Sequence, residues 1–181
     1  MIRAAICDDE PTILDYLHEH ISLEFKHQDA DIHIDKYTSG KDFLNAHKGE
    51  PFDVVFLDID MPEISGFEIA GHINDISDAL IVFVTLHDEL VYSSLKFRPF
   101  RFIRKAYLDN ELPETLESII TETAKRNLDS KFVFQTKSGE AFVDLNNVIY
   151  IEIYGHWLRV CLKDGEPLEC YGSLTSFERE L

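Results

Sequence analysis

Residues 1–126 alternate between two hydrophobic patterns. Short apolar runs predict β-strands, and longer stretches with apolar residues three or four positions apart predict amphipathic helices between them. The expected strands are residues 3–7, 31–37, 53–58, 79–85 and 100–105, and the expected helices are 11–25, a short one from 40, 66–75, 88–96 and 111–126. Five strand–helix units in this order favour an α/β fold, a (βα)5 doubly wound parallel sheet with helices on both faces.

The pattern changes near residues 127–130. Short strand-like runs separated by turns follow, and residues 173–181 resemble a helix that starts at a serine cap. Asp164-Gly165 lies between two apolar runs, which is a strong signal for a β-hairpin. We therefore expect two domains, residues 1–126 and a small, mostly-β domain at 131–181, with a short ordered linker. Cys161 and Cys170 would face each other only if the hairpin loop had four residues, and two separate thiols are the simpler interpretation.

Composition indicates the cellular compartment in which the protein works. The chain has 181 residues, of which 45% are hydrophobic, enough for an ordinary packed core. No apolar run reaches the roughly 18 residues that span a bilayer, and the start, MIRAAICDDE, does not resemble a signal peptide. Three cysteines give no disulfide framework. These features predict a cytoplasmic protein with no membrane partner.

The formal net charge of −17 is unevenly distributed. Residues 1–130 carry 12 Lys+Arg and 26 Asp+Glu, whereas residues 131–181 carry 5 and 8. Neither part has the basic character of a nucleic-acid-binding surface, and the acidic first part repels DNA at long range. Any contact with DNA is therefore expected from a local patch on the second part.

Polar residues follow four of the expected strands. Asp8 and Asp9 come after the first strand, Asp58 ends the third, Thr85 ends the fourth and Lys105 ends the fifth. The carboxyl ends of parallel strands share one edge, so these side chains converge. Three carboxylates repel one another, and Mg²⁺ is a suitable counter-ion because it prefers oxygen ligands and needs few of them. A carboxylate beside Mg²⁺ can act as a nucleophile toward phosphorus, with a hydroxyl and an ammonium holding phosphoryl oxygens.

The order of these motifs, with Met61-Pro62 and Gly66 after Asp58, resembles the receiver domain of two-component response regulators. The resemblance covers the whole of the first part. It implies that Asp58 is the phosphoacceptor and that a sensor histidine kinase is the phosphoryl donor. It also implies a Mg²⁺ site in which Asp9, Asp58 and the backbone carbonyl of Asp60 are ligands and Asp8 holds metal-bound water.

The same resemblance assigns roles around the phosphoryl group. Thr85 would bond it, Lys105 would pair with one of its oxygens, and Phe102 occupies the position of the aromatic switch residue. Asp60 and His87 flank the path of attacking water and would tune dephosphorylation. The sequence departs from the family at two places: Lys105 is followed by Ala106 rather than proline, and Phe102 replaces the commoner tyrosine.

Charged residues on the expected switch face suggest a phosphorylation-linked homodimer. Opposite charges a short distance apart suit a self-complementary twofold contact. The residues concerned are Lys96, Arg98, Arg101, Arg104, Asp109, Glu111 and Glu114.

The second part resembles the first half of a LytTR-type DNA-binding domain. The resemblance rests on Val148-Ile-Tyr-Ile-Glu152, Gly155-His156, Asp164-Gly165 and Tyr171-Gly-Ser-Leu174. It implies binding to promoter direct repeats by the complete protein, with His156 and Arg159 as DNA contacts. The chain stops about where that domain is half complete, which leaves unpaired strand edges able to pair with another chain.

Three functions are compatible with these patterns. The first is a response regulator whose phosphorylation controls a DNA-binding output. The alternative is a receiver that signals only by protein–protein contact because its output domain is incomplete. A third is a phosphatase or phosphotransferase of the haloacid dehalogenase type, since Asp58-Ile-Asp60 has that motif's acids, although on the third strand instead of the first. In the first two cases the protein is a phosphoacceptor and not a conventional enzyme.

Overall fold

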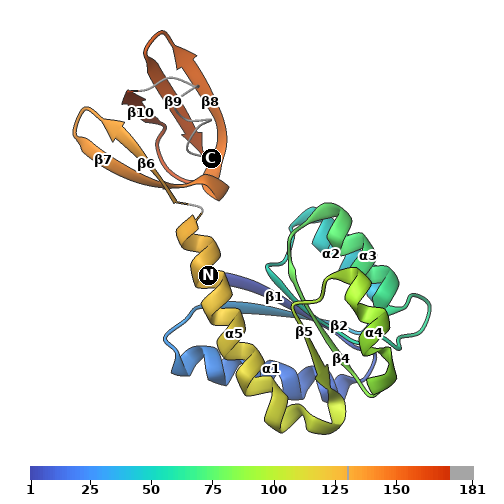
Figure 1. Cartoon of the computed structure of the whole chain (residues 1–181). Coiled ribbons are helices and arrows are strands. Elements are labelled where there is room, and N and C mark those ends of the chain that lie inside the picture. Colours follow the sequence, from blue (N-terminus) through green and yellow to red (C-terminus); the bar gives the residue numbers. More distant parts are fainter. Residues whose placement is uncertain (130, 172–181) are drawn as a thin grey trace. The chain divides into compact units, whose positions relative to one another are not determined.

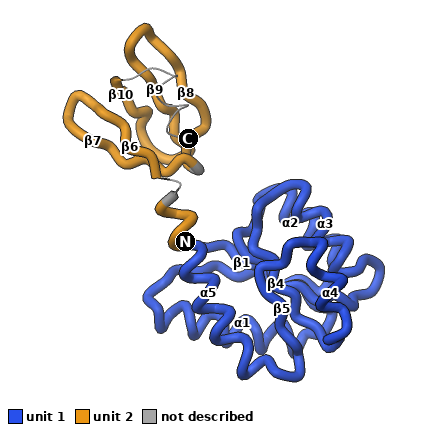
Figure 2. The backbone as a smooth tube through the Cα atoms, in the orientation of Figure 1, with its two compact units in different colours: residues 1–123 blue, residues 124–181 orange. Residues whose placement is uncertain are grey.

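The computed structural model describes residues 1–129 and 131–171, which form two compact units, 1–123 and 124–181 (Figures 1 and 2). The structure confirms the prediction of an α/β part followed by a mostly-β part. The division falls slightly before the 127–130 boundary expected from the sequence and lies inside helix α5 (Leu108–Asp129), so the end of this helix belongs to the second unit.

The first unit is a five-stranded parallel sheet in the order β2-β1-β3-β4-β5. Its strands are β1 (Ile2–Cys7), β2 (Ile32–Tyr37), β3 (Val54–Leu57), β4 (Leu80–Thr85) and β5 (Arg101–Arg104). The longer helices are α1 (Pro11–His27), α2 (Gly40–Gly49), α3 (Gly66–Ile76) and α5 (Leu108–Asp129). Figure 1 shows α1 and α5 on one side of the sheet and α2, α3 and the short α4 (Val91–Ser94) on the other.

Two apolar layers enclose this sheet. β3 and β4 are buried at every position, because side chains on both of their faces meet helices. One layer joins Val54 and Val82 to Leu17 of α1 and Leu116 of α5. The other joins the remaining strand face to α2 and α3, with Phe83 at its centre. A rigid sheet of this kind holds the polar groups at its strand ends in place.

The segment expected to be one helix at 88–96 is broken into three short pieces. Residues Asp88–Leu90 and Leu95–Phe97 are 3₁₀ turns, and only Val91–Ser94 is α-helical. The last piece ends at Arg98, which adopts the left-handed conformation with a φ of 50°. The expectation of a continuous helix here was wrong.

Helix α5 begins three residues before the expected position, at Leu108. Pro113 therefore lies inside the helix. It is the sixth residue of the helix, just beyond the first turn, so it removes one backbone donor that would otherwise bond within the helix.

The second unit is an antiparallel sheet in the order β7-β6-β10-β9-β8. Its strands are β6 (Lys131–Thr136), β7 (Gly139–Asp144), β8 (Val148–Tyr154), β9 (Trp157–Leu162) and β10 (Leu168–Tyr171). A small core on one face includes Phe134, Leu158, Val160 and Cys170. β7 and β8 are the edge strands among the described residues.

The strand register separates the two cysteines of this unit. Cys170 lies opposite Leu158, and Cys161 lies opposite Tyr150, so the two thiols do not face each other. Both are free and buried. The helix expected at 173–181 lies outside the described residues. No helix in the described part of the chain is both long and apolar enough to cross a membrane.

Candidate functional site

The acidic residues expected at one edge of the parallel sheet do lie together. Asp8 follows β1 and Asp58 follows β3, and both are almost completely buried, with 1% and 5% of their surface exposed. The backbone N–H of Asp58 donates to the carbonyl of Cys7, so the parallel ladder continues to the two acids and aligns them. Oδ1 of Asp58 accepts from the N–H of Ile59 at 2.8 Å, which leaves Oδ2 directed at neighbouring side chains.

A divalent cation fits the acids of this edge. One carboxylate oxygen from each of Asp8, Asp9 and Asp58 lies within 4.8 Å of the others. Asp9 is exposed whereas its two partners are buried, so an ion here would contact both protein and water. Hard carboxylate oxygens and room for several waters are the conditions that Mg²⁺ requires.

Lys105 reaches into the same cluster. Its ammonium lies 2.8 Å from Asp8 Oδ2, 3.1 Å from Asp58 Oδ2 and 3.0 Å from Glu10 Oε1, and only 5% of its side chain is exposed. Burial lowers the pKa of this ammonium, but bonding to Asp8 and the charge of Asp58 outweigh burial and hold the pKa above its ordinary value. Lys105 is therefore a permanent positive charge beside the acids. Lys105 is followed by Ala106 where the family usually has proline, and its ammonium still reaches the acids.

Burial also shifts the pKa of Asp8. Removal from water raises the pKa of this carboxyl, and the bonds from Lys105 and from the N–H of Glu10 only partly offset the effect. The thiol of Cys7, just below, has its pKa raised to about 12 by burial and by the charges of Asp8 and Asp58. That thiol stays neutral at physiological pH and lies 3.8 Å from the sulfur of Met61.

Glu10 was not predicted from the sequence as a site residue. Its carboxylate accepts from Lys105 at 3.0 Å from the exposed side of the cluster. The signal was the run Asp8-Asp9-Glu10, but the direction of each side chain depends on the turn into α1 and not on the composition of the run.

The same sheet edge also carries Thr85, Asp60 and His87, which lie at or just after the ends of strands β3 and β4. Thr85 is fully buried, and its hydroxyl accepts from the N–H of His87 at 3.3 Å. His87 lies between two carboxylates, with Nδ1 3.0 Å from Glu89 and Nε2 3.5 Å from Asp60. The hydrogen bond to Glu89 is the main cause that raises the pKa of His87.

Gly66 explains the close approach of α3 to the acidic edge. An added Cβ would lie 2.0 Å from the carbonyl oxygen of Asp58, far inside any permitted contact. Glycine is therefore required for α3 to start against the loop after β3. Ser65 and Glu68 form a capping box that fixes this start.

Phe102 is half-buried and packs against the cluster around Phe83, which is its partner on β4. The charged residues expected to form a twofold contact are partly paired within the chain. Arg104 Nε donates to Glu111 at 2.7 Å, and Arg101 lies 3.9 Å from Glu114.

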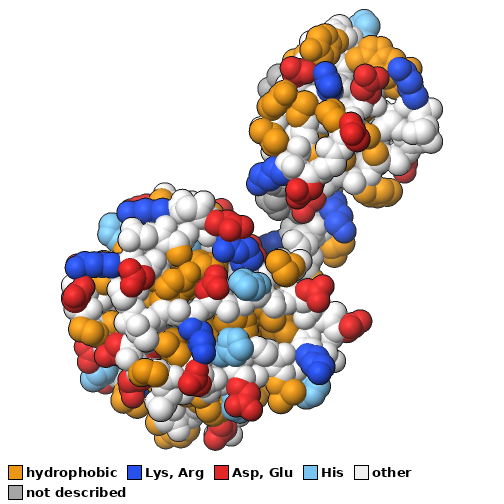
Figure 3. All heavy atoms as spheres, turned by 180° about the vertical axis from the view of Figure 1, so that it is seen from behind, with side chains coloured by type: hydrophobic (Ala, Val, Ile, Leu, Met, Phe, Trp, Pro, Cys, Tyr) orange, Lys and Arg blue, Asp and Glu red, His pale blue; other side chains and the backbone are white. Residues whose placement is uncertain are grey.

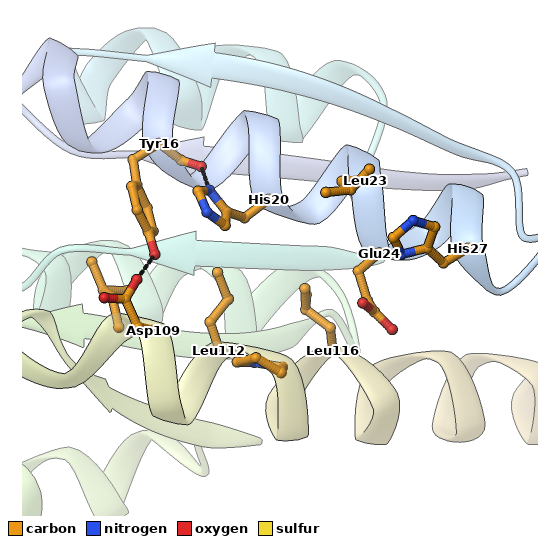
Figure 4. Close-up of a pocket in the computed structure, with 10 residues that line it drawn as sticks. Tyr16, His20, Leu23, Glu24, His27, Asp109, Leu112 and Leu116 are labelled. Atoms are coloured by element: carbon orange, nitrogen blue, oxygen red, sulfur yellow. Dashed lines mark hydrogen bonds between the residues drawn. The ribbon is translucent and has the colours of Figure 1, made fainter.

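A separate groove of about 300 Å³ lies between α1 and α5 (Figure 4). Its floor is apolar, and Leu112 and Leu116 of α5 point into the groove toward α1. At one end Tyr16 donates to Asp109, and this bond raises the pKa of the phenol to about 12. His20, Glu24 and His27 of α1 also line this groove, which contains none of the acids of the cluster around Lys105.

In the second unit, His156 is exposed in the turn between β8 and β9. Arg159 is in the middle of β9 and lies 3.9 Å from Glu152 of β8. The two expected DNA contacts therefore come from a turn and from a strand face, and not from one loop.

Residues 4–117 match the response regulator receiver domain. The chain belongs to this receiver family. It is 32% identical over 129 residues to the transcriptional regulatory protein BtsR of Salmonella typhi, covering 71% of this chain and 52% of that protein. It is 27% identical over 133 residues to the sensory transduction protein LytR of Staphylococcus saprophyticus, covering 71% and 51%. The transcriptional regulatory protein NatR of Bacillus subtilis is 23% identical over 182 residues, covering 100% and 76%.

The receiver unit also resembles solved structures. The response regulator TrrA from Thermotoga maritima in complex with Mg²⁺-BeF is 30% identical, with a TM-score of 0.57, covering 66% of this chain and 99% of that chain. The chain spans about half the length of most of the curated relatives described above. Membership of the receiver family decides against the haloacid dehalogenase interpretation, because receivers are signalling and regulatory modules.

Proposed function

We propose that the receiver unit accepts one phosphoryl group on Asp58, in a Mg²⁺-dependent reaction with a sensor histidine kinase as donor. The observation that supports this most directly is the meeting of Asp8, Asp9 and Asp58 within 4.8 Å, with the Lys105 ammonium 3.1 Å from Asp58. Acids that were only surface turns would not converge on one buried ammonium.

The carboxylates of Asp9 and Asp58 and the carbonyl of Asp60 would hold Mg²⁺, with Asp8 binding a water of its shell. When bound, the ion supplies positive charge that offsets the negative phosphoryl oxygens. The Mg²⁺-BeF complex of the TrrA structure is consistent with such a site in a related receiver.

In the transfer step, a carboxylate oxygen of Asp58 forms the new bond to phosphorus. The bond between phosphorus and the donor's imidazole nitrogen breaks, and its electron pair remains on that nitrogen. Lys105 exchanges its contact with the carboxylate for one with a phosphoryl oxygen, and the Thr85 hydroxyl donates to another. Both groups therefore stabilise charge that develops during transfer.

The test is incubation with acetyl phosphate and Mg²⁺, followed by intact mass spectrometry. We expect one added phosphoryl group per chain, no addition in Asp58→Asn, and none when EDTA removes the metal. Asp75→Asn, an exposed acid on α3, is the matched control and should be phosphorylated normally. Phosphorylation of Asp58→Asn at the normal rate would overturn the assignment, and rapid turnover of a phosphate ester would favour an enzyme.

Asp60 and His87 are proposed to tune dephosphorylation, because their 3.5 Å contact lies at the rim beside Asp58. Asp60→Asn should change the half-life of the phosphoryl group on Asp58. An unchanged half-life, measured by the decay of the phosphorylated mass, would remove this role.

For the whole protein we propose transcription regulation in the cytoplasm through a LytTR-like output. Support comes from NatR, a transcriptional regulatory protein that aligns along the full chain, and from the all-β second unit. His156 and Arg159 would contact DNA, and phosphorylation would favour a homodimer through the face containing Arg101 and Arg104. Mobility shifts on direct-repeat promoter DNA, with this chain and a longer form, distinguish this output from signalling by protein contact alone.

A further inference from the structure

The β8 edge of the second unit lacks the protection that edge strands usually carry. β8 pairs with β9 on one side only, and no other described strand lies on its outer side. The remaining edges are more polar: β2 contains His33, Asp35 and Lys36, β5 has an arginine at each end, and β7 contains Glu140 and Asp144. Along its seven residues β8 carries one charge, Glu152. A long apolar edge with free backbone groups is a template for another strand.

Large apolar side chains are exposed on both faces of this strand. Tyr150 and Tyr154 are 52% and 61% exposed on the face of Glu152, and Ile153 is 50% exposed on the opposite face. Figure 3 shows hydrophobic side chains at the surface of the second unit, interspersed with charged ones. Both faces of β8 therefore carry apolar surface that side chains of a second strand could cover.

The sequence of β8 indicates which partner fits. Residues 150–154 read YIEIY, which is the same in both directions. In an antiparallel pair centred on Glu152, Tyr150 lies opposite Tyr154 of the second copy, and Ile151 lies opposite Ile153. The irregularity in β8 falls between Val148 and Tyr150, so the palindromic part is regular. An isologous twofold contact requires this self-complementarity.

We propose that β8 pairs with β8 of a second copy of this chain, antiparallel and about a twofold axis at Glu152. Cross-strand aromatic and β-branched pairs stabilise such a ladder, and backbone hydrogen bonds join the two sheets. The two Glu152 carboxylates meet at the axis, where Arg159, 3.9 Å away on β9 of each copy, offsets their repulsion. This contact is independent of the phosphoryl site and of the receiver's switch face.

The first test introduces charges at the paired positions 150 and 154. Dimerisation of the full chain is measured by sedimentation velocity without a phosphodonor. Tyr150→Lys with Tyr154→Lys places like charges opposite each other twice and should weaken the dimer by at least about tenfold in Kd. Tyr150→Lys with Tyr154→Glu places opposite charges together and should restore much of the affinity. Because the chain has a net charge of −17, a general charge effect would favour the double-lysine variant instead.

The second test is a disulfide at the axis. Glu152→Cys should form a covalent dimer on mild oxidation, because directly opposite residues have their Cβ atoms about 5 Å apart. Lys137→Cys, exposed in the turn between β6 and β7 and away from the β8 edge, is the control and should not cross-link, and the native cysteines are buried. A wild-type chain that is monomeric at all concentrations would overturn the proposal. So would equal association of the two charge variants, or a Glu152→Cys chain that does not cross-link.

Discussion

The ammonium of Lys105, at the end of β5, lies 3.1 Å from Oδ2 of Asp58, at the end of β3. Forty-seven positions separate the two residues in the sequence, and the strand between them in the sheet is β4. The contact therefore depends on the register of three strands. It joins a buried anion to a buried cation, so neither group can be removed without leaving the other uncompensated.

Lys105→Met should lower the free energy of unfolding by about 3 kcal/mol at pH 7 without Mg²⁺, because the carboxylates of Asp8 and Asp58 then remain buried without a counter-charge. Saturating Mg²⁺ should recover a large part of the loss, since the ion restores positive charge. Urea unfolding with and without Mg²⁺ measures both effects.

Lys36→Met is the matched control for this prediction. Lys36 lies 2.8 Å from Asp15, a distance equal to that between Lys105 and Asp8, but both partners are exposed. Surface ion pairs contribute little because water screens them. Equal losses in the two variants would show that burial of the Lys105 cluster is not what makes its charges important.

Asp8→Asn should weaken the pH dependence of stability in the absence of metal. Burial raises the pKa of Asp8 in the folded state above its unfolded value, so stability falls as the pH rises through the folded pKa. Asparagine carries no charge and removes this fall. Thermal unfolding between pH 4 and pH 7 should show a flatter pH dependence for the variant.

The same substitution should abolish stabilisation by magnesium. At about 100 times its Kd, a ligand that binds only the folded state adds about 2.7 kcal/mol. The wild-type melting temperature should therefore rise with Mg²⁺, whereas that of Asp8→Asn should stay nearly constant. A full magnesium response in the variant would mean that Asp8 is not part of the metal site.

His47, which lies away from the acidic edge, contributes to folding stability in a way that depends on pH. It is fully buried, accepts from the N–H of Phe52 through Nδ1 and contacts the Ser77 hydroxyl at 2.9 Å. Burial, and then the charge of Arg3, lower its pKa in the folded state. The unfolded chain therefore binds a proton more readily than the folded one, and stability is lost as the pH falls below about 6.5.

One such group can change the free energy of unfolding by at most about 1.4 kcal/mol per pH unit. We expect His47→Asn to reduce the slope of unfolding free energy between pH 6.5 and pH 5, whatever its effect on absolute stability. His33→Asn, at an exposed position, is the control and should keep the wild-type slope. The prediction is contradicted if the two variants titrate alike.

Much of this fold follows from the sequence because its signals are local and consistent. The run at Val54–Leu57 is apolar at every position, which is typical of a strand covered on both faces, and Asp58 must then lie at the sheet edge. The convergence of Asp8, Asp9 and Asp58 follows from the parallel topology alone. Their chemical roles stay predictions.

Other features depend on side-chain directions or weak preferences. Glu10 joins Lys105 only because the chain turns into α1 at Pro11. The segment 88–97 has apolar residues at helical spacing but forms three short pieces, and Arg98 follows them with a left-handed φ of 50°. The spacing of apolar residues predicts a helix there but does not indicate where it is interrupted.

Two glycines of α3 should respond to alanine in opposite directions. At Gly66 a Cβ would lie 2.0 Å from the Asp58 carbonyl, so Gly66→Ala must displace the loop that holds the acid and should cost about 1–3 kcal/mol. At Gly71 the nearest neighbour is Phe97 at an ordinary 3.8 Å, and alanine should stabilise the helix by up to about 1 kcal/mol. Urea unfolding gives both values, and the rate of phosphorylation by acetyl phosphate should fall for Gly66→Ala alone. If Gly66→Ala kept wild-type stability and rate, the approach of α3 to Asp58 would not constrain the site.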